Sequence, residues 1–179
     1  MGSFPFAQTV GNAPVPLSIL LGGTGKTTAP AAFNALNPNA APANYLPANP
    51  AGTVSTTQVM MGLGITYTPA SSGLVLAMIA FGFYTLTAAT SVVLSAQYGT
   101  GAAPANGAAV TGTLFGGNAA ETYAGSEFAT SSRPIAFMAL LSLSAGTAYW
   151  FDVAVATTAA ADEAVIQNVS AVVAELPAG

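Results

Sequence analysis

The sequence predicts an all-β protein, an antiparallel, jelly-roll-like β-sandwich that follows an extended, proline-rich N-terminal arm. Short apolar runs recur at the spacing of strands and are separated by turn residues. No long stretch shows the apolar period of an amphipathic helix. Eight of the twelve prolines precede residue 53, so the composition changes there. We expect the arm to comprise residues 1–53 and the sandwich residues 54–179.

The arm is predicted to be extended because proline removes a backbone N–H and fixes φ, which excludes regular helix and central strand. Bulky apolar residues are spaced among small ones along it. We expect these side chains to dock on another protein, although a flexible linker is the alternative. The candidate arm contacts are Phe4, Phe6, Phe33, Leu36, Tyr45 and Leu46.

The sandwich region divides into eight predicted strands. They comprise residues 58–68, 74–86, 91–98, 110–115, 122–128, 135–143, 148–156 and 165–176. Gly- and Ser-rich turns separate them, and the turn at 144–147 predicts a hairpin between its two neighbours. Eight strands at this spacing predict two packed antiparallel sheets.

The predicted strand 74–86 is apolar on both faces. One face carries Val75, Ala77, Ile79, Phe81 and Phe83, and the other carries Leu74, Leu76, Met78, Ala80, Gly82, Tyr84 and Leu86. A sandwich strand in a monomer needs only one buried face. The second face is therefore expected to lie against another subunit or under the arm. Closed symmetry is usual for such assemblies, and we expect a homotrimer.

Charged residues make up only 4% of the chain, against roughly 25% in ordinary domains. They are Lys26, Arg133, Glu121, Glu127, Asp152, Asp162, Glu163 and Glu175. Two cations cannot neutralise a run of phosphates, so no nucleic-acid partner is expected. A surface without charge does little to keep copies apart, so much of it is expected to be buried against other subunits or a partner.

Several other classes of site are also disfavoured. The chain has no His and no Cys, which excludes zinc sites, thiol nucleophiles and disulfides. Residues 73–96 are uncharged and long enough to cross a bilayer as a helix. They are nevertheless rich in β-formers and lack flanking Lys or Arg, so two strands are favoured and no membrane partner is expected.

Residues 22–28 resemble a phosphate-binding loop around Lys26. The first glycine of that pattern is missing, since Leu20 stands in its place, and Pro30 follows where a helix should begin. Nucleotide hydrolysis is therefore not expected.

The remaining acids suggest an ion pair more than catalysis. Glu121 and Glu127 could share a strand face, and Asp162 and Glu163 are adjacent, but solvated loop acids are the simpler interpretation. Arg133 could pair with Glu121 or Glu127, within the subunit or across an interface. The aromatic run 149–151 is expected to pack in the core and at an interface. We expect no catalytic residue, cofactor or metal.

Several turn and core motifs resemble those of small β-sandwich virion proteins of tailed bacteriophages and prophages. The motifs lie at residues 60–64, 66–69, 72–76, 98–101, 104–113, 146–152 and 168–170. The resemblance covers about residues 55–176 and omits the arm. Its motifs are specific for fold and weak for role, and no catalytic residues are carried over. This chain departs from the group in its poverty of charge.

The resemblance implies a non-enzymatic structural subunit on the outer surface of a virion. We expect a capsid decoration or cement protein that binds copies of itself and the major capsid protein and stabilises the head. The alternative is a tail, collar or head-fibre component.

Overall fold

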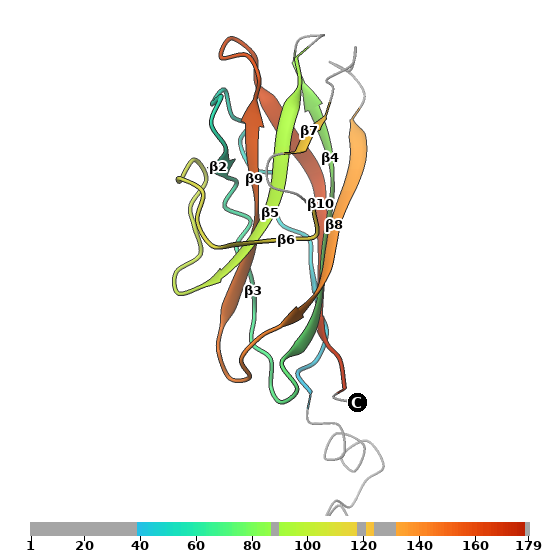
Figure 1. The fold of residues 1–179 in the computed structure, drawn as a ribbon. Helices are drawn as coiled ribbons and strands as arrows, with labels where there is room; N and C mark the ends of the chain where they lie inside the picture. Colours follow the sequence, from blue (N-terminus) through green and yellow to red (C-terminus); the bar gives the residue numbers. More distant parts are fainter. Residues whose placement is uncertain (1–38, 87–89, 118–120, 124–131, 178–179) are drawn as a thin grey trace, which may run out of the picture. The chain divides into compact units, whose positions relative to one another are not determined.

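Residues 39–86, 90–117, 121–123 and 132–177 are described by the computed structural model, and they form two antiparallel sheets packed face to face (Figure 1). The all-β, antiparallel sandwich predicted from the sequence is confirmed. The compact unit that contains it begins at Asn39.

Each sheet is built from strands that are distant in the sequence. The four-stranded sheet has the order β1 (Ala43–Tyr45), β10 (Ala164–Glu175), β4 (Leu74–Thr85) and β8 (Arg133–Ser142). The six-stranded sheet has the order β2 (Val59–Met60), β9 (Tyr149–Thr157), β5 (Val92–Thr100) and β6 (Thr113–Phe115), with β3 (Ile65–Tyr67) also on β9 and β7 (Glu121–Tyr123) also on β5.

The strand pairs are nested like a long hairpin that has been rolled up. The first strand, β1, pairs with the last, β10, and β2 and β3 pair with β9. Inside them β4 pairs with β8, and β5 pairs with β6 and β7. This nesting defines a jelly roll, so the predicted topology also holds.

The core forms where the two sheets face each other. On β4, the face that carries Val75, Ile79 and Phe81 is buried, as the alternation predicts. Phe81 packs on Phe137 of β8, with ring centroids 6.1 Å apart. The six-stranded sheet supplies a second aromatic contact, Phe115 edge-on to Phe151 at 6.0 Å.

The predicted strand 58–68 is divided in two. Gly62 and Gly64 have φ of +70° and +66°, a conformation that L side chains rarely adopt, and the segment between β2 and β3 leaves the sheet there. The sequence motif at residues 60–64 therefore forms a bend, which the prediction of a single strand over residues 58–68 missed.

The predicted hairpin at 144–147 is wrong. β8 and β9, on either side of that turn, belong to different sheets. The turn bonds instead to the segment before β4: Leu143 N–H donates to Gly73 O at 2.7 Å, and Gly146 N–H to Pro69 O at 2.7 Å. These bonds join two connections, each of which runs from one sheet to the other.

The boundary expected at residue 53 falls inside this unit. β1 forms an edge of the four-stranded sheet, with Asn44 opposite Val172. Pro42 and Pro47 flank it, and proline is tolerated beside a short edge strand because no neighbouring strand needs its N–H. Part of the proline-rich segment thus belongs to the sandwich.

Candidate functional site

The predicted arm contacts fall into two groups. Phe4, Phe6, Phe33 and Leu36 lie outside the described residues. Tyr45 packs against the core of its own chain, and its hydroxyl donates to the Thr66 carbonyl. Leu46 is 83% exposed. A contact from Leu46 to a partner stays a prediction.

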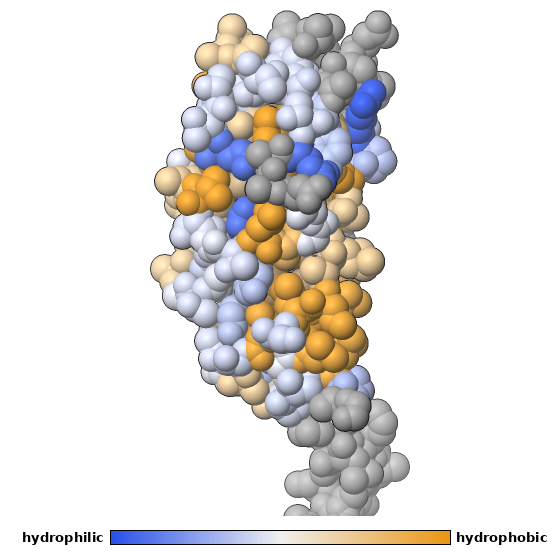
Figure 2. Space-filling view, in the orientation of Figure 1, coloured by the Kyte–Doolittle hydropathy of each residue, from blue (hydrophilic) through white to orange (hydrophobic). Residues whose placement is uncertain are grey.

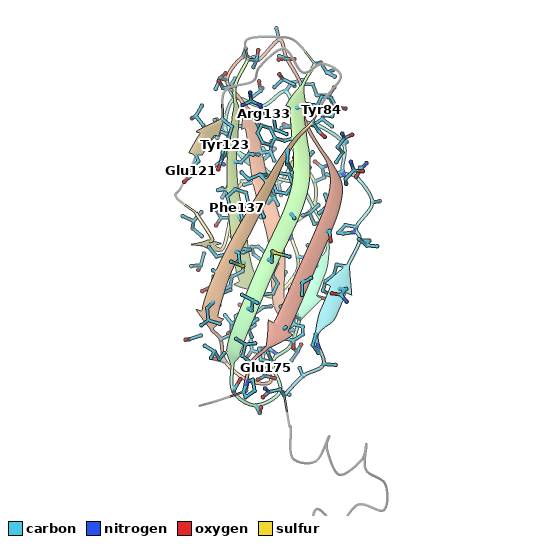
Figure 3. The ribbon with its side chains drawn as sticks, turned by 90° about the vertical axis from the view of Figure 1, so that its right-hand side faces the viewer. Tyr84, Glu121, Tyr123, Arg133, Phe137 and Glu175 are labelled. Carbon is cyan, nitrogen blue, oxygen red and sulfur yellow. The ribbon has the colours of Figure 1, made fainter. Side chains whose placement is uncertain are left out.

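The predicted ion-pair residues lie at one end of the sandwich, where Figure 3 labels Arg133, Tyr123 and Glu121. The Tyr123 hydroxyl donates to Glu121 Oε2 at 2.5 Å, and the Tyr123 ring packs on Phe83, opposite Arg133 in the sheet. Burial, followed by this hydrogen bond, raises the pKa of Tyr123 to about 12. Glu127 lies outside the described residues, and the pairing of Arg133 with Glu121 or Glu127 stays a prediction.

Glu175 holds the opposite end of the sandwich together (Figure 3). Its carboxylate accepts a bond from the Ser72 hydroxyl at 3.2 Å and four backbone N–H bonds of 2.6 to 2.9 Å, from Ala40, Ala70, Ser71 and Gly73. Burial would raise its pKa, but the four N–H donors outweigh burial and lower the pKa from the usual 4.5 to about 2. One carboxylate thus joins the start of the unit, the segment before β4 and the end of β10.

Asp152 performs a similar task inside the six-stranded sheet. Its carboxylate, 1% exposed, accepts N–H bonds from Gly62 at 2.9 Å, Leu63 at 3.2 Å and Val153 at 2.8 Å. These bonds fix the bend between β2 and β3. Burial raises the pKa of this carboxyl, and the three N–H donors lower it only in part.

Replacing Asp152 with Asn should therefore change the pH dependence of stability. Because the folded pKa of Asp152 lies above its unfolded value, the wild type is stabilised below the unfolded pKa and loses that contribution as pH rises through the folded pKa. Asp152→Asn lacks this loss. The difference in unfolding free energy should shift toward the variant with rising pH, by roughly 1.4 kcal/mol per unit of pKa shift. Denaturant unfolding from acid to neutral pH measures this difference, and a pH-independent difference would contradict it.

The charged residues in the described part of the chain are buried or half-buried. Six of the eight charged residues lie there, and none of them is fully exposed: Asp152, Asp162 and Glu175 are buried, and Glu121, Arg133 and Glu163 are half-buried. The fully exposed residues of these ranges are therefore all neutral, either polar or apolar.

The outer side of the four-stranded sheet is part of this neutral surface. Its outward side chains form cross-strand rows, in which Val172, Met78 and Met138 are neighbours and Ala174, Leu76 and Leu140 form the next row. Met138 is 58% exposed and Leu140 56%. Figure 2 shows hydrophobic side chains gathered on the side of the molecule where β8 lies. We call this surface, on β4, β8 and β10, the apolar face.

One end of the apolar face is hollowed. The hollow has a volume of about 430 Å³ and is lined by Ala80, Phe81, Gly82, Ser132, Pro134, Ile135 and Asn168. A β-bulge in β10 adjoins it: the register shifts between Gln167 and Ser170, and Asn168 has φ of +54°. The Asn168 N–H donates to Asn49 Oδ1 at 2.8 Å, which anchors the bulge. We call this feature the Gly82 hollow.

The prediction of which residues of β4 point inward and which point outward is confirmed. The prediction missed that β8 contributes side chains to the apolar face. The signal was available, because Pro134, Ala136, Met138 and Leu140 alternate along the strand and are all exposed. Without knowledge that β8 pairs with β4, this alternation could not be joined to the outward face of 74–86.

Other features of the sequence find structural roles or lie outside the described residues. Residues 22–28, with Lys26, are outside them. Trp150 is buried, and its indole N–H donates to Thr100 O at 3.1 Å, as expected of a core aromatic. Within the described ranges no three acidic side chains gather closely enough to hold a metal ion. No helix in those ranges is long and apolar enough to span a bilayer.

Comparisons with known proteins identify no family for this chain. No protein-family model matches the sequence, and no curated protein matches it. Among solved structures, a chain in a structure of the infectious bursal disease virus Gx strain is similar, with a TM-score of 0.44 and 10% identity over 76% of this chain. The match covers 33% of that chain, so this protein spans about a third of its length. At this identity and TM-score the similarity supports no functional conclusion.

Proposed function

We propose that this chain is a non-enzymatic structural subunit of a virion, a capsid decoration or cement protein of a tailed phage. It acts as a homo-oligomer on the outer surface of the head, where it binds the major capsid protein and stabilises the shell. The turn and core motifs resemble those of phage virion sandwiches, which supports this class of protein, and the surface of the chain supports the role.

One observation carries the proposal: no charged side chain in the described part of the chain is fully exposed. A neutral surface with an apolar sheet face has little electrostatic protection against association. Such a chain is suited to a state in which much of its surface is buried. A shell that offers many identical binding sites provides that state, and binding to the assembled form stabilises it.

The use of the buried acids supports a structural role. The carboxylate oxygens of Asp152 and Glu175 accept hydrogen bonds from backbone N–H groups of loops. A general acid or base needs a carboxylate that can reach a substrate proton. Carboxylates tied to their own backbone on several sides are suited to fixing loops instead.

Copy number on purified particles tests the proposal. Quantitative mass spectrometry of the particle should find this chain in numbers comparable with the major capsid protein, and reconstruction should show it on the outside of the head. A handful of copies at the tail or collar would contradict decoration and favour the alternative role. A separate assay of heads with and without the protein should show greater resistance to heating when it is bound.

Attachment to heads should depend weakly on salt. Screening reduces interactions between exposed charges but not apolar contacts or backbone hydrogen bonds. The fraction of protein bound to stripped heads should therefore change less than about twofold between low salt and 1 M salt, where the Debye length has fallen to about 3 Å. Co-sedimentation measures this fraction, and release at high salt would contradict apolar attachment.

A further inference from the structure

We propose that Asn106 is a modification site, at which the side-chain amide is converted to a carboxylate through attack by the Gly107 backbone nitrogen. The closed fold restrains this reaction through hydrogen bonds, so the modification proceeds only when the loop between β5 and β6 opens. The conversion needs water and no partner protein, so it goes beyond the proposed function and does not depend on it.

Asn106 and Gly107 occupy the centre of a tight turn in the β5–β6 loop, residues 101–112. The Ala108 N–H donates to Ala105 O at 3.1 Å, which closes the turn, and Gly107 has φ of +83°. A turn of this kind requires positive φ at its third residue, which glycine adopts without strain. Both central residues are exposed, and Asn106 is the only asparagine of the chain that glycine follows. Water therefore has access to the one Asn-Gly pair in the sequence.

The reaction exchanges one amide for another and then hydrolyses the product. The Gly107 nitrogen loses its proton to base and attacks Cγ of Asn106. A bond from that nitrogen to Cγ forms, the bond from Cγ to Nδ2 breaks, and Nδ2 takes up a proton and leaves as ammonia. Water then opens the resulting succinimide ring at either carbonyl, which yields aspartate or isoaspartate. Glycine favours the attack because it has no Cβ to crowd the approaching nitrogen.

Two hydrogen bonds restrain these groups while the loop is closed. The Gly107 N–H donates to Met60 O at 2.8 Å, and Asn106 Nδ2 donates to Ala51 O at 3.1 Å. A backbone amide gives up its proton to solvent when its hydrogen bond opens, which is the basis of protection from hydrogen exchange. The first bond therefore withholds the nucleophile, and the second fixes the leaving group against a neighbouring segment.

A small separate core holds the loop closed. Met60, Trp150 and Ala154 are buried together, and Ala108 of the loop packs against them. The Met60 N–H also donates to Ala108 O at 2.8 Å. The side chain of Met60 thus supports the segment whose carbonyl restrains Gly107. Its packing should determine the population of the open loop and, with it, the rate of modification.

Conversion would alter the loop in two ways. A carboxylate oxygen would face Ala51 O, where an N–H donor had been, and isoaspartate would add one carbon atom to the main chain after residue 106. Both changes weaken the attachment of the loop. Each converted copy would also gain a negative charge in a stretch that has none between Lys26 and Glu121. Modification would therefore add charge to a surface whose fully exposed described residues are neutral.

Peptide mapping by mass spectrometry tests the modification on the full-length protein at mildly alkaline pH, in buffer and in concentrated urea. Asn106 should convert in both solutions, to aspartate and isoaspartate peptides that separate by chromatography, and at least about tenfold more slowly in buffer. Asn44 and Asn168, which bulkier residues follow, are internal controls and should convert far more slowly than Asn106 in urea. Asn106→Gln keeps an amide but would need a larger ring, so it should abolish the signal.

Met60→Val tests the restraint. Its smaller side chain should loosen the separate core and open the loop more often, which should raise the rate in buffer at least about fivefold. Met138→Val is the matched control, because Met138 is 58% exposed on β8 of the other sheet, and the rate should stay nearly unchanged. Circular dichroism checks folding. If Met60→Val does not fold, hydrogen exchange of the wild type serves instead: across temperatures, the conversion rate should follow the exchange rate of the Gly107 amide.

Several results would overturn this assignment. Absence of conversion at Asn106 in urea, or in buffer for both the wild type and Met60→Val, would remove the modification site. Equal rates in buffer and urea, or equal rates for Met60→Val and Met138→Val, would show that the loop does not restrain the reaction. None of these results changes the copy number expected on particles, so each leaves the proposed function untouched.

Discussion

Glu175→Gln should lower the free energy of unfolding by about 3 kcal/mol at neutral pH, although the side chain changes by a single group. The carboxylate offers two acceptor oxygens to four backbone N–H groups and the Ser72 hydroxyl. The amide of Gln keeps one acceptor oxygen. Its NH₂ group replaces the other oxygen of Glu175, Oε1 or Oε2, and faces N–H groups that had donated hydrogen bonds to that oxygen. Buried donors that lose a charged acceptor cost about 1–3 kcal/mol each, and some can turn to water.

The pH dependence gives this prediction a second, independent readout. Because the folded pKa of Glu175, about 2, lies below the ordinary 4.5, its contribution is fully present above pH 4.5 and is lost as pH falls toward 2. The wild type should therefore lose its advantage over Glu175→Gln across that window. Asp152→Asn should show the opposite trend, since burial raises the pKa of Asp152. Urea unfolding of the three proteins from pH 2 to 7 measures both slopes.

Glu163→Gln is the matched control. Glu163 is half-buried at the entrance to β10, and its side chain makes no hydrogen bond to other described residues. Its substitution should change stability by less than about 0.5 kcal/mol. If Glu175→Gln were equally mild and showed no change in pH dependence, the carboxylate would not be what joins this end of the sandwich.

The sequence could predict the sandwich because its signals are local. Alternation along residues 74–86 identifies an inward and an outward face without knowledge of any neighbour, since successive side chains of a strand point to opposite sides. Turn residues mark the strand ends in the same way. Both depend on residues close in the chain, so the class of fold and most strand positions follow from the sequence.

The role of Glu175 could not be predicted in that way. Its donors lie at residues 40 and 70–73, more than 100 positions away in the chain. The sequence shows only an acid near the end of a strand, which is also what a solvated acid looks like. The hairpin at 144–147 failed for a related reason: a turn shows that the chain reverses, but not whether the next strand joins the same sheet.

Gly73→Ala is expected to have the largest effect of any substitution discussed, a loss of about 2–5 kcal/mol. Gly73 has φ of +67°, which costs a side-chain-bearing residue about 1–2 kcal/mol. A Cβ there would also overlap the Leu143 carbonyl oxygen, a backbone atom that cannot rotate away. Forcing the two segments apart costs about 1–3 kcal/mol more. Thermal and denaturant unfolding should both record the loss.

Gly146→Ala separates the two causes. Gly146 has φ of +75°, close to that of Gly73, but apart from its two chain neighbours no described residue would have an atom within 4 Å of its Cβ. This substitution should cost only the conformational part, about 1–2 kcal/mol. Equal losses at the two positions would show that the contact with Leu143 is not the cause.

The two largest effects should also fail to add, because Gly73 and Glu175 belong to one network. Gly73 donates its N–H to Glu175 and accepts from Leu143, so moving Gly73 off the Leu143 carbonyl weakens the bond that Glu175→Gln also removes. The double variant should therefore be more stable than the sum of the single losses predicts, by at least about 0.5 kcal/mol. Gly146→Ala combined with Glu175→Gln should come closer to additivity, since Gly146 does not contact Glu175. Strict additivity in the first pair would mean that the Leu143 contact and the carboxylate stabilise this end of the sandwich independently.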